Sequence, residues 1–168
     1  MSYDVNYVRE NFHYDPKTGI LSWAKPNRGR TLGRPVGNKD KNGHLWVTIK
    51  EGDKLPKYSV HRIAWVYVYG KEPSDQIDHI NGIKTDNRIS NLREANNAQN
   101  MRNRGKQENN TSGLKGVSFH SHTKKYRATI QVDGKHIHLG LFDCPAAAYC
   151  KYQIAAHTHF GQFAGRGS

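Results

Sequence analysis

The chain has 168 residues, of which 35% are hydrophobic, and this composition favours two small folded units over one domain with a large core. Its formal net charge of +12 indicates a polyanionic partner, with nucleic acid the first candidate and a membrane surface the rival. No run of about 18 apolar residues and no secretory signal sequence is present, which predicts an intracellular protein. Two cysteines, Cys144 and Cys150, are too few for a disulfide framework or a four-thiolate zinc site.

The first 57 residues predict a β-rich basic region that packs with the domain after it. A turn signal at residues 14–19 precedes a predicted strand at residues 20–23, and alternation predicts a second strand at residues 44–49. The loop between them, residues 25–41, is rich in Gly, Pro, Lys and Arg. Three of its arginines either contact phosphate or are only solvated, and the pattern leaves both alternatives open: Arg28, Arg30 and Arg34.

The middle block, residues 58–104, is predicted to hold the catalytic core. Apolar residues recur at helical spacing over residues 59–69, and Gly70 is placed to end that helix. His61, on this apolar helix, is expected to pack rather than to contact DNA or metal. Residues 76–80 predict a short strand. The block is also the least basic part of the chain, as expected if its carboxylates hold a metal.

The predicted strand is followed by a turn and then by a helix signal. Asn81-Gly82 favours a tight turn, and Asn91 stands three residues before Glu94 in the pattern of a capping box. This pattern predicts a helix that begins at Asn91 and runs to about Arg102. Residues 105–113 contain no apolar residue and predict a linker between two domains.

Beyond the linker, residues 114–164 predict a three-stranded antiparallel sheet covered by one helix. The predicted strands are the alternating runs 116–120, 126–132 and 135–140, and Asp133-Gly134 joins the last two as a hairpin turn.

The alternation of these strands gives the sheet an apolar face and a polar face. The apolar face is formed by Val117, Phe119, Tyr126, Ala128, Ile130, Val132, Ile137 and Leu139. The polar face carries Ser118, His120, Arg127, Thr129, Gln131, His136 and His138. Asp143 is predicted to cap the final helix, with Pro145 in its first turn. A stripe of small residues and one tyrosine on this helix is expected to cover the apolar face: Ala148, Tyr152, Ala155 and Ala156.

Asp78 and His79 are adjacent at the end of the predicted strand, and Asn91 and Asn100 follow them along the chain. Hydrolysis of a phosphodiester needs a base that deprotonates water and a metal that neutralises charge on the phosphate. His79 is the candidate base. Asp78 and Asn100 offer oxygen ligands, which suit Mg²⁺ or another divalent cation such as Mn²⁺. Asn96 is the alternative to Asn100 as second ligand.

Four segments of the middle block resemble the HNH endonucleases with a ββα-metal fold, particularly the homing type of phages and introns: His61–Ala64, Ile77–Gly82, Thr85–Arg88 and Ser90–Arg93. The resemblance implies that His79 is the general base and that Asp78 and Asn100 hold the metal. It also implies that Asn91 holds the loop so that the histidine ring is oriented. Many members end the motif with His where this chain has Asn, a variant known among homing-type members.

The C-terminal residues 114–164 resemble the AP2 domain, whose three-stranded sheet lies in the major groove of DNA. The matching segments are Lys115–Val117, Tyr126–Ala128, His138–Phe142, Ala146–Tyr149 and Phe160–Gly161. Leu139 and Ser118 replace a Trp and an Arg that are common in the family, so no sequence preference is carried over. The candidate DNA contacts are Arg102, Arg104, Lys124, Lys125, Arg127, Thr129, Gln131 and His138. A merely solvated polar face is the alternative.

The sequence therefore predicts an α+β protein in which a ββα-metal HNH nuclease is followed by an AP2-like DNA-binding domain. Its expected function is Mg²⁺-dependent nicking or cutting of double-stranded DNA at a preferred site, in the host cytoplasm if the chain is phage-encoded. Two alternatives are a DNA-binding regulator with a degenerate nuclease site and an RNA-binding protein. The Asp78-His79 pair disfavours the first, and the lack of stacking aromatic residues on the polar face disfavours the second. The oligomeric state is left open.

Overall fold

The computed structural model describes residues 4–26, 30–49, 55–103, 105 and 110–165. The chain divides into two compact units, Met1–Asn96 and Asn97–Ser168. The division falls before helix α3 (Asn97–Asn103), whereas the sequence pattern predicts the boundary at residues 105–113, of which 106–109 lie outside the described residues. Both units combine helices with antiparallel strands, which confirms a mixed α and β architecture.

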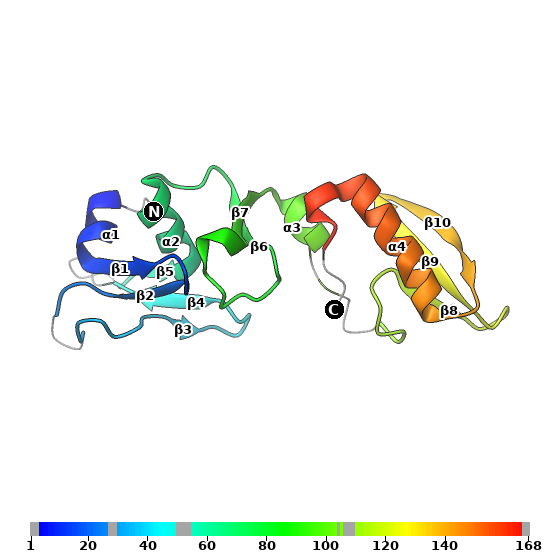
Figure 1. Ribbon diagram of the computed structural model, residues 1–168, viewed down its shortest axis with the longest axis horizontal. Coiled ribbons are helices and arrows are strands. Elements are labelled where there is room, and N and C mark those ends of the chain that lie inside the picture. Colours follow the sequence, from blue (N-terminus) through cyan, green and yellow to red (C-terminus); the bar gives the residue numbers. More distant parts are fainter. Residues whose placement is uncertain (1–3, 27–29, 50–54, 104, 106–109, 166–168) are drawn as a thin grey trace. The chain divides into compact units, whose positions relative to one another are not determined.

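The described part of the first unit combines two α-helices with small antiparallel sheets (Figure 1). Its elements are α1 (Val5–Asn11), β1 (Phe12–Asp15), β2 (Ile20–Trp23), β3 (Asn38–Lys39), β4 (Leu45–Thr48), β5 (Lys57–Ser59), α2 (Val60–Tyr69), β6 (Gln76–His79), the 3-10 helix η1 (Ile89–Asn91) and β7 (Leu92–Ala95). One sheet pairs β1 with β2, a second has the order β3-β4-β5, and a third pairs β6 with β7. The structure thus has the strands predicted near residues 20–23 and 44–49.

Helix α1 and strand β1 were not predicted, and local side chains explain why they form. The Asp4 carboxylate caps α1 by accepting hydrogen bonds from the backbone N–H groups of Asn6 and Tyr7. Phe12 and Tyr14 then alternate inward along β1 and are both buried. Strand β1 ends at Asp15, so it overlaps the start of residues 14–19, where the sequence pattern indicates only a turn.

Helix α2 is the centre of the first unit's core. Ile63, Ala64 and Val66 are each 0% exposed, and the helix packs against α1, β4 and β5. Gly70 ends it in the left-handed conformation, with its N–H bonded to the Val66 carbonyl. The helix predicted at residues 59–69 is confirmed, and it holds His61 on a rigid element.

Residues Leu92–Ala95 form strand β7, so the helix predicted to begin at Asn91 is wrong there. β7 pairs with β6, placing Asp78 opposite Arg93. The Glu94 carboxylate accepts hydrogen bonds from the backbone N–H and the hydroxyl of Ser74, at 2.6 and 3.0 Å, instead of closing a capping box. Pairing with β6 satisfies this backbone, and the helix, α3, begins only at Asn97.

The second unit contains a three-stranded antiparallel meander covered by a helix, as predicted. Its elements are α3, β8 (Val117–His120), β9 (Lys125–Val132), β10 (Lys135–Phe142), α4 (Pro145–Phe160) and the 3-10 helix η2 (Gly161–Phe163). The strand order is β10-β9-β8, and α4 packs on one face of the sheet through buried Ala148, Tyr152 and Ala156 (Figure 1).

The N-cap of α4 is Cys144 and not Asp143 as predicted. The Cys144 sulfur accepts a hydrogen bond from the Ala147 N–H at 3.4 Å, and Pro145 occupies the first helical turn. The Asp143 carboxylate instead pairs with Lys125 at 3.1 Å. A carboxylate one residue outside the cap position cannot reach the first turn and finds a partner on the neighbouring strand.

A β-bulge in β10 changes which side chains share a face. The pairing shifts between His138, opposite Thr129, and Gly140, opposite Ala128, so Leu139 is an extra residue in the strand. After the bulge, Leu141 lies opposite Arg127. The polar face predicted from simple alternation is therefore interrupted by one apolar side chain, which is 39% exposed.

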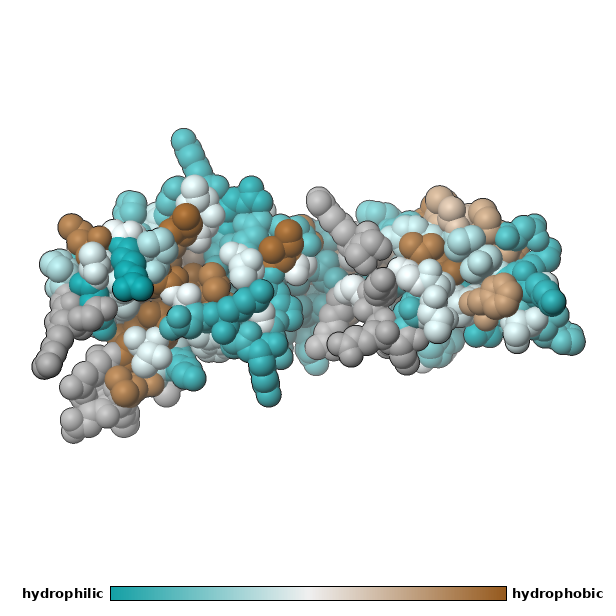
Figure 2. Space-filling model, turned by 90° about the horizontal axis from the view of Figure 1, so that it is seen from below, coloured by the Kyte–Doolittle hydropathy of each residue, from teal (hydrophilic) through white to brown (hydrophobic). Residues whose placement is uncertain are grey.

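On the face of the molecule seen in Figure 2, hydrophobic residues form scattered patches among hydrophilic ones on both units. None of the described helices is both long and apolar enough to cross a membrane.

Candidate active site

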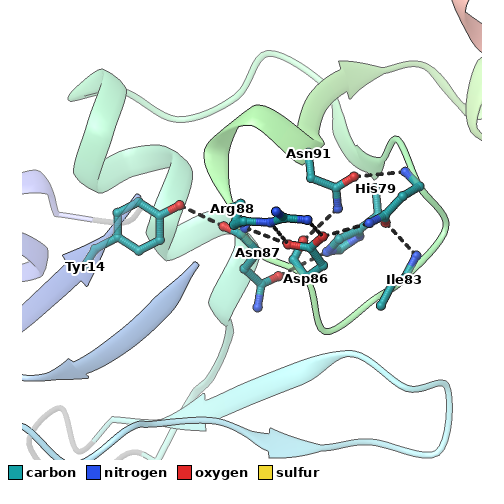
Figure 3. Close-up of polar contacts among 8 residues, drawn as sticks. Tyr14, His79, Ile83, Asp86, Asn87, Arg88 and Asn91 are labelled. Carbon is teal, nitrogen blue, oxygen red and sulfur yellow. Dashed lines mark hydrogen bonds and ion pairs between the residues drawn. The ribbon is translucent and has the colours of Figure 1, made fainter. Parts of the chain in front are cut away.

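The loop between β6 and η1 is fastened by two asparagine side chains (Figure 3). Asn91 Oδ1 accepts the backbone N–H of Asn81 at 2.9 Å, and Asn91 Nδ2 donates to the Asp86 carbonyl at 2.8 Å. Asn81 donates from Nδ2 to Asp86 Oδ2 at 2.7 Å and accepts the Ile83 N–H at 2.8 Å. Asn91 thus ties the start of the loop to its end, which is the arrangement that a loop-holding role requires.

Asp86 and Arg88 add a charged clamp to this loop. Arg88 donates from Nε to Asp86 Oδ1 at 2.8 Å and from Nη2 to Oδ2 at 2.6 Å (Figure 3). The hydrogen bonds from Arg88, only partly opposed by burial, lower the pKa of Asp86 to about 2. The carboxylate is therefore charged at neutral pH, and the segment before Asn91 has a defined geometry.

His79 lies at the end of β6 with a defined ring orientation (Figure 3). It is 4% exposed, and its Nε2 lies 3.1 Å from Oδ1 of Asn87, which is 1% exposed. Because an amide oxygen only accepts hydrogen bonds, this contact requires the ring proton on Nε2 and leaves the acceptor lone pair on Nδ1. Burial lowers the pKa of His79 even though the Asn87 bond opposes the shift. A neutral imidazole is the form that a general base needs.

Two more histidine rings lie near His79. The ring centroids of His61, on α2, and His44, just before β4, are 5.2 and 5.6 Å from that of His79, and 5.4 Å from each other. Burial, reinforced by His79, lowers the pKa of His61 to about 3, and burial also lowers the pKa of His44. Among the described residues, Nδ1 of His44 and Nδ1 of His61 are buried without a hydrogen-bond partner. His61 packs in the helix, as expected, but it does so beside the candidate base.

Asp78 is buried and paired. Its Oδ2 accepts hydrogen bonds from Nε and Nη2 of Arg93, at 2.9 and 2.7 Å, and the two side chains are 6% and 11% exposed. Neighbouring residues of a strand point to opposite faces, so the Asp78 and His79 side chains leave β6 on different sides. The ion pair compensates a buried negative charge that would otherwise be costly.

The remaining predicted metal ligands lie in or beside α3. Asn100 is half-buried on α3 in the second unit, and Asn96 is exposed at the end of the first. In the part of the chain that the structure describes, no three His, Cys, Asp or Glu side chains are grouped to hold a metal. The predicted ligands are one carboxylate and one amide, so they would not form a group of three such side chains. Carboxylate and amide oxygens are the donor types that suit a hard divalent cation.

The predicted DNA contacts on the sheet gather on the face away from α4. Arg127, Thr129 and Gln131 alternate along β9, and His138 lies opposite Thr129 on β10. Arg127 Nε lies 3.4 Å from the Ser118 hydroxyl, to which it donates. Among the two lysines, Lys124 is exposed with a φ of 54°, whereas Lys125 pairs with Asp143.

Arg102 is held inside the second unit. Its guanidinium lies 4.7 Å from the centroid of the Phe160 ring, and its Nη2 is 3.3 Å from Asp133 Oδ1. Its carbonyl accepts a hydrogen bond from Lys115 Nζ at 2.6 Å. These contacts give Arg102 a packing role, and Arg104 lies outside the described residues.

Comparison with known proteins adds the family. A model of the HNH endonuclease family matches residues 58–102. Protein 3.8 of Escherichia phage T7 is 32% identical over 116 residues, which cover 68% of this chain and 93% of that protein. The chain belongs to the protein 3.8 family of phage T7. In this family member, the match to the HNH endonuclease model is confined to residues 58–102.

Among solved structures, one of the HNH homing endonuclease I-HmuI matches with 20% identity and a TM-score of 0.45. The match covers 60% of this chain and 55% of that one, so the chain spans about half the length of I-HmuI.

The protein 3.8 family member has site residues that the sequence did not assign. Asn87, which lies within the Thr85–Arg88 motif, contacts the His79 ring through its side-chain oxygen. His44 and Tyr14 come from outside residues 58–102, and Tyr14 donates its hydroxyl to the Asn87 carbonyl at 2.8 Å (Figure 3). The spacing of the motif carries no signal for either residue, because their proximity arises only in the folded chain.

Proposed function

We propose that this protein is a divalent-metal-dependent DNA endonuclease of the homing type, which nicks or cuts double-stranded DNA at a preferred site. The observation that carries the proposal is the placement of His79 at the end of β6, a buried ring whose Nε2 lies 3.1 Å from Asn87 Oδ1. This contact leaves Nδ1 as the nitrogen that can accept a proton. The HNH family match of residues 58–102 supports the same reaction.

In the proposed reaction, His79 acts as the general base. Nδ1 takes a proton from a water molecule while the water oxygen bonds to phosphorus. The bond from phosphorus to the 3′ oxygen breaks, the 3′ oxygen leaves with the electron pair and takes a proton from solvent, and a 5′-phosphate remains. Asn87 keeps the ring in the required tautomer, and Asn91 keeps the surrounding loop in place.

Asp78 and Asn100 are the residues that would hold the cation, with Asn96 as the alternative to Asn100. A divalent cation bound there would neutralise charge on the phosphate and on the leaving oxygen. In the structure, Arg93 neutralises Asp78, so a cation would share or displace this partner.

The second unit is proposed to supply DNA affinity as an AP2-like domain, with the exposed face of its sheet against the DNA. Arg127, Thr129, Gln131 and His138 offer donors and acceptors for base edges, and exposed Lys124 suits a phosphate. This face keeps its polar groups in solvent rather than in the core, as a binding surface requires.

A supercoiled-plasmid cleavage assay tests the endonuclease directly. Purified full-length protein with Mg²⁺ or Mn²⁺ is expected to convert supercoiled DNA to the nicked or linear form, and EDTA is expected to abolish the conversion. Cleavage that persists in EDTA would contradict the metal requirement. A protein that binds DNA but cleaves it with neither cation would instead be the DNA-binding regulator. The ion pair between Arg93 and Asp78 favours this rival function, because it occupies a proposed metal ligand.

Arg127→Ala is expected to weaken DNA binding by about 1–3 kcal/mol, because Arg127 lies at the centre of the exposed sheet face. Affinity is measured by fluorescence anisotropy at several salt concentrations, since the loss of a phosphate contact also lowers the salt dependence of binding. Lys151→Ala, which removes an exposed charge from α4, is the matched control. Equal losses in both variants would show that net charge, and not this face, sets the affinity.

A further inference from the structure

We infer that the β1–β2 hairpin is a working part of the nuclease site, and that Tyr14 is a positioning residue that orients His79 through Asn87. The inference rests on the proposed function, in which His79 is the base. It assigns a role in catalysis to a segment outside residues 58–102, the region matched by the HNH family model.

The first observation is a pair of hydrogen bonds that meet at Asn87, one at its backbone carbonyl and one at its side chain. The Tyr14 hydroxyl donates to the Asn87 carbonyl at 2.8 Å, and the Asn87 side-chain oxygen lies 3.1 Å from His79 Nε2 (Figure 3). Tyr14, Asn87 and His79 are 3%, 1% and 4% exposed, so solvent cannot replace either bond cheaply. Burial raises the pKa of Tyr14 to about 12, which keeps the phenol protonated as a donor.

The second observation is the close approach of the hairpin turn to the same peptide. A Cβ on Gly19 would stand 2.4 Å from the Arg88 nitrogen and 2.6 Å from the Asn87 carbonyl carbon, and Gly19 has a φ of +74°. The turn has its own support, because the Asp15 carboxylate accepts from the Lys17 N–H at 2.9 Å and from the Thr18 hydroxyl at 2.8 Å. A rigid turn therefore lies directly against the backbone that carries Asn87.

These two contacts fix Asn87 by its backbone, and its side chain is then aimed at His79. Loss of the Tyr14 hydroxyl frees the carbonyl to shift, and the shift reaches the imidazole through one rigid residue. Displacements of about 1 Å at a reacting group can cost on the order of a hundredfold in rate. A partial release of Asn87 is expected to cost less than that and to leave DNA affinity intact.

The test compares single-turnover cleavage rates and DNA affinities of full-length variants. Tyr14→Phe is expected to slow cleavage about tenfold at saturating protein with unchanged DNA affinity, because only orientation is lost. Tyr67→Phe is the matched control, since its ring packs 5.9 Å from that of Tyr14 and the substitution removes a hydroxyl while the Asn87 bond stays in place. Equal rates for wild type and Tyr14→Phe would overturn the inference.

A double-mutant cycle separates positioning from general destabilisation. Asn87→Leu removes the acceptor for His79, so adding Tyr14→Phe to it is expected to slow cleavage no further. Multiplicative losses in the double variant would show that Tyr14 acts on stability and not through Asn87. Gly19→Ala, which pushes on the Asn87–Arg88 peptide, is expected to reproduce the tenfold loss from the other contact.

A measurement without DNA keeps this inference distinct from the nuclease proposal. Imidazole ¹⁵N spectra of the metal-free protein are expected to show the Nε2–H tautomer of His79 in the wild type and in Tyr67→Phe, and a mixture of tautomers in Tyr14→Phe. The His79 signals are assigned by their loss in His79→Ala. An unchanged tautomer in Tyr14→Phe refutes the positioning role even if DNA is cleaved. A changed tautomer in a protein that cleaves no DNA supports the positioning role and rejects the nuclease.

Discussion

His79→Ala is expected to slow DNA cleavage by about 10²–10⁴-fold, the usual contribution of a positioned general base. Within the group of His44, His61 and His79, the ring of His79 is held by a hydrogen bond to Asn87, at 3.1 Å. The substitution removes the base but leaves the oxygen donors of Asp78 and Asn100, so binding of DNA and of Mg²⁺ is expected to persist. The cleavage rate is measured under single-turnover conditions with the supercoiled plasmid.

His157→Ala is the control, because His157 is exposed on α4 and belongs to the second unit. It is expected to cleave at the wild-type rate. Wild-type cleavage by His79→Ala would exclude this histidine as the base and direct attention to His61 or His44. Loss of DNA binding together with cleavage would instead assign His79 a structural role.

Arg93→Met is expected to destabilise the first unit by about 3–5 kcal/mol, because it leaves the buried Asp78 carboxylate without its cationic partner. Urea unfolding followed by tryptophan fluorescence measures this unit selectively, since all three tryptophans, Trp23, Trp46 and Trp65, lie in it. Arg62→Met is the control. Its ion pair with Glu72 is about a third exposed, at 31% and 30%, and its loss is expected to cost about 1 kcal/mol or less.

Two further measurements show whether the charge of Asp78 is the cause. Adding Asp78→Asn to Arg93→Met is expected to recover much of the lost stability, because the uncompensated charge is gone. If Asp78 holds a cation, Mg²⁺ is expected to stabilise Arg93→Met more than it stabilises the wild type. The same response to Mg²⁺ in both proteins would argue against Asp78 as a ligand.

Much of the fold follows from local patterns that tertiary contacts do not oppose. Helix α2 has apolar residues at helical spacing and a terminal glycine, and the three strands of the second unit alternate around a two-residue turn. Prediction from sequence patterns is wrong where a polar side chain has two possible hydrogen-bond or ion-pair partners. Glu94 resembles the end of a capping box, yet it bonds to Ser74, and Asp143 resembles an N-cap, yet it pairs with Lys125.

The candidate site shows a similar division. The adjacent Asp78 and His79 are recognisable in the sequence because the motif keeps their spacing. Asn87, His44 and Tyr14 are not recognisable in this way, since their relation to His79 depends on how three distant segments pack. The bulge at Leu139 also cannot be predicted from alternation. Its one inserted residue reverses the face of every position after it in the strand.

The bond between Tyr14 and Asn87 also bears on how such a motif is exchanged between proteins. Residues 58–102 transplanted alone into another scaffold would bring the Asn87 carbonyl without the phenol that holds it and without the glycine turn that lies against it. The HNH segment of this chain would therefore lose two contacts to Asn87 if it were moved into another protein on its own. During recombination, selection would act on the hairpin and the motif as one inherited unit, although more than sixty residues, from Gly19 to Asn87, separate their contacting parts along the chain.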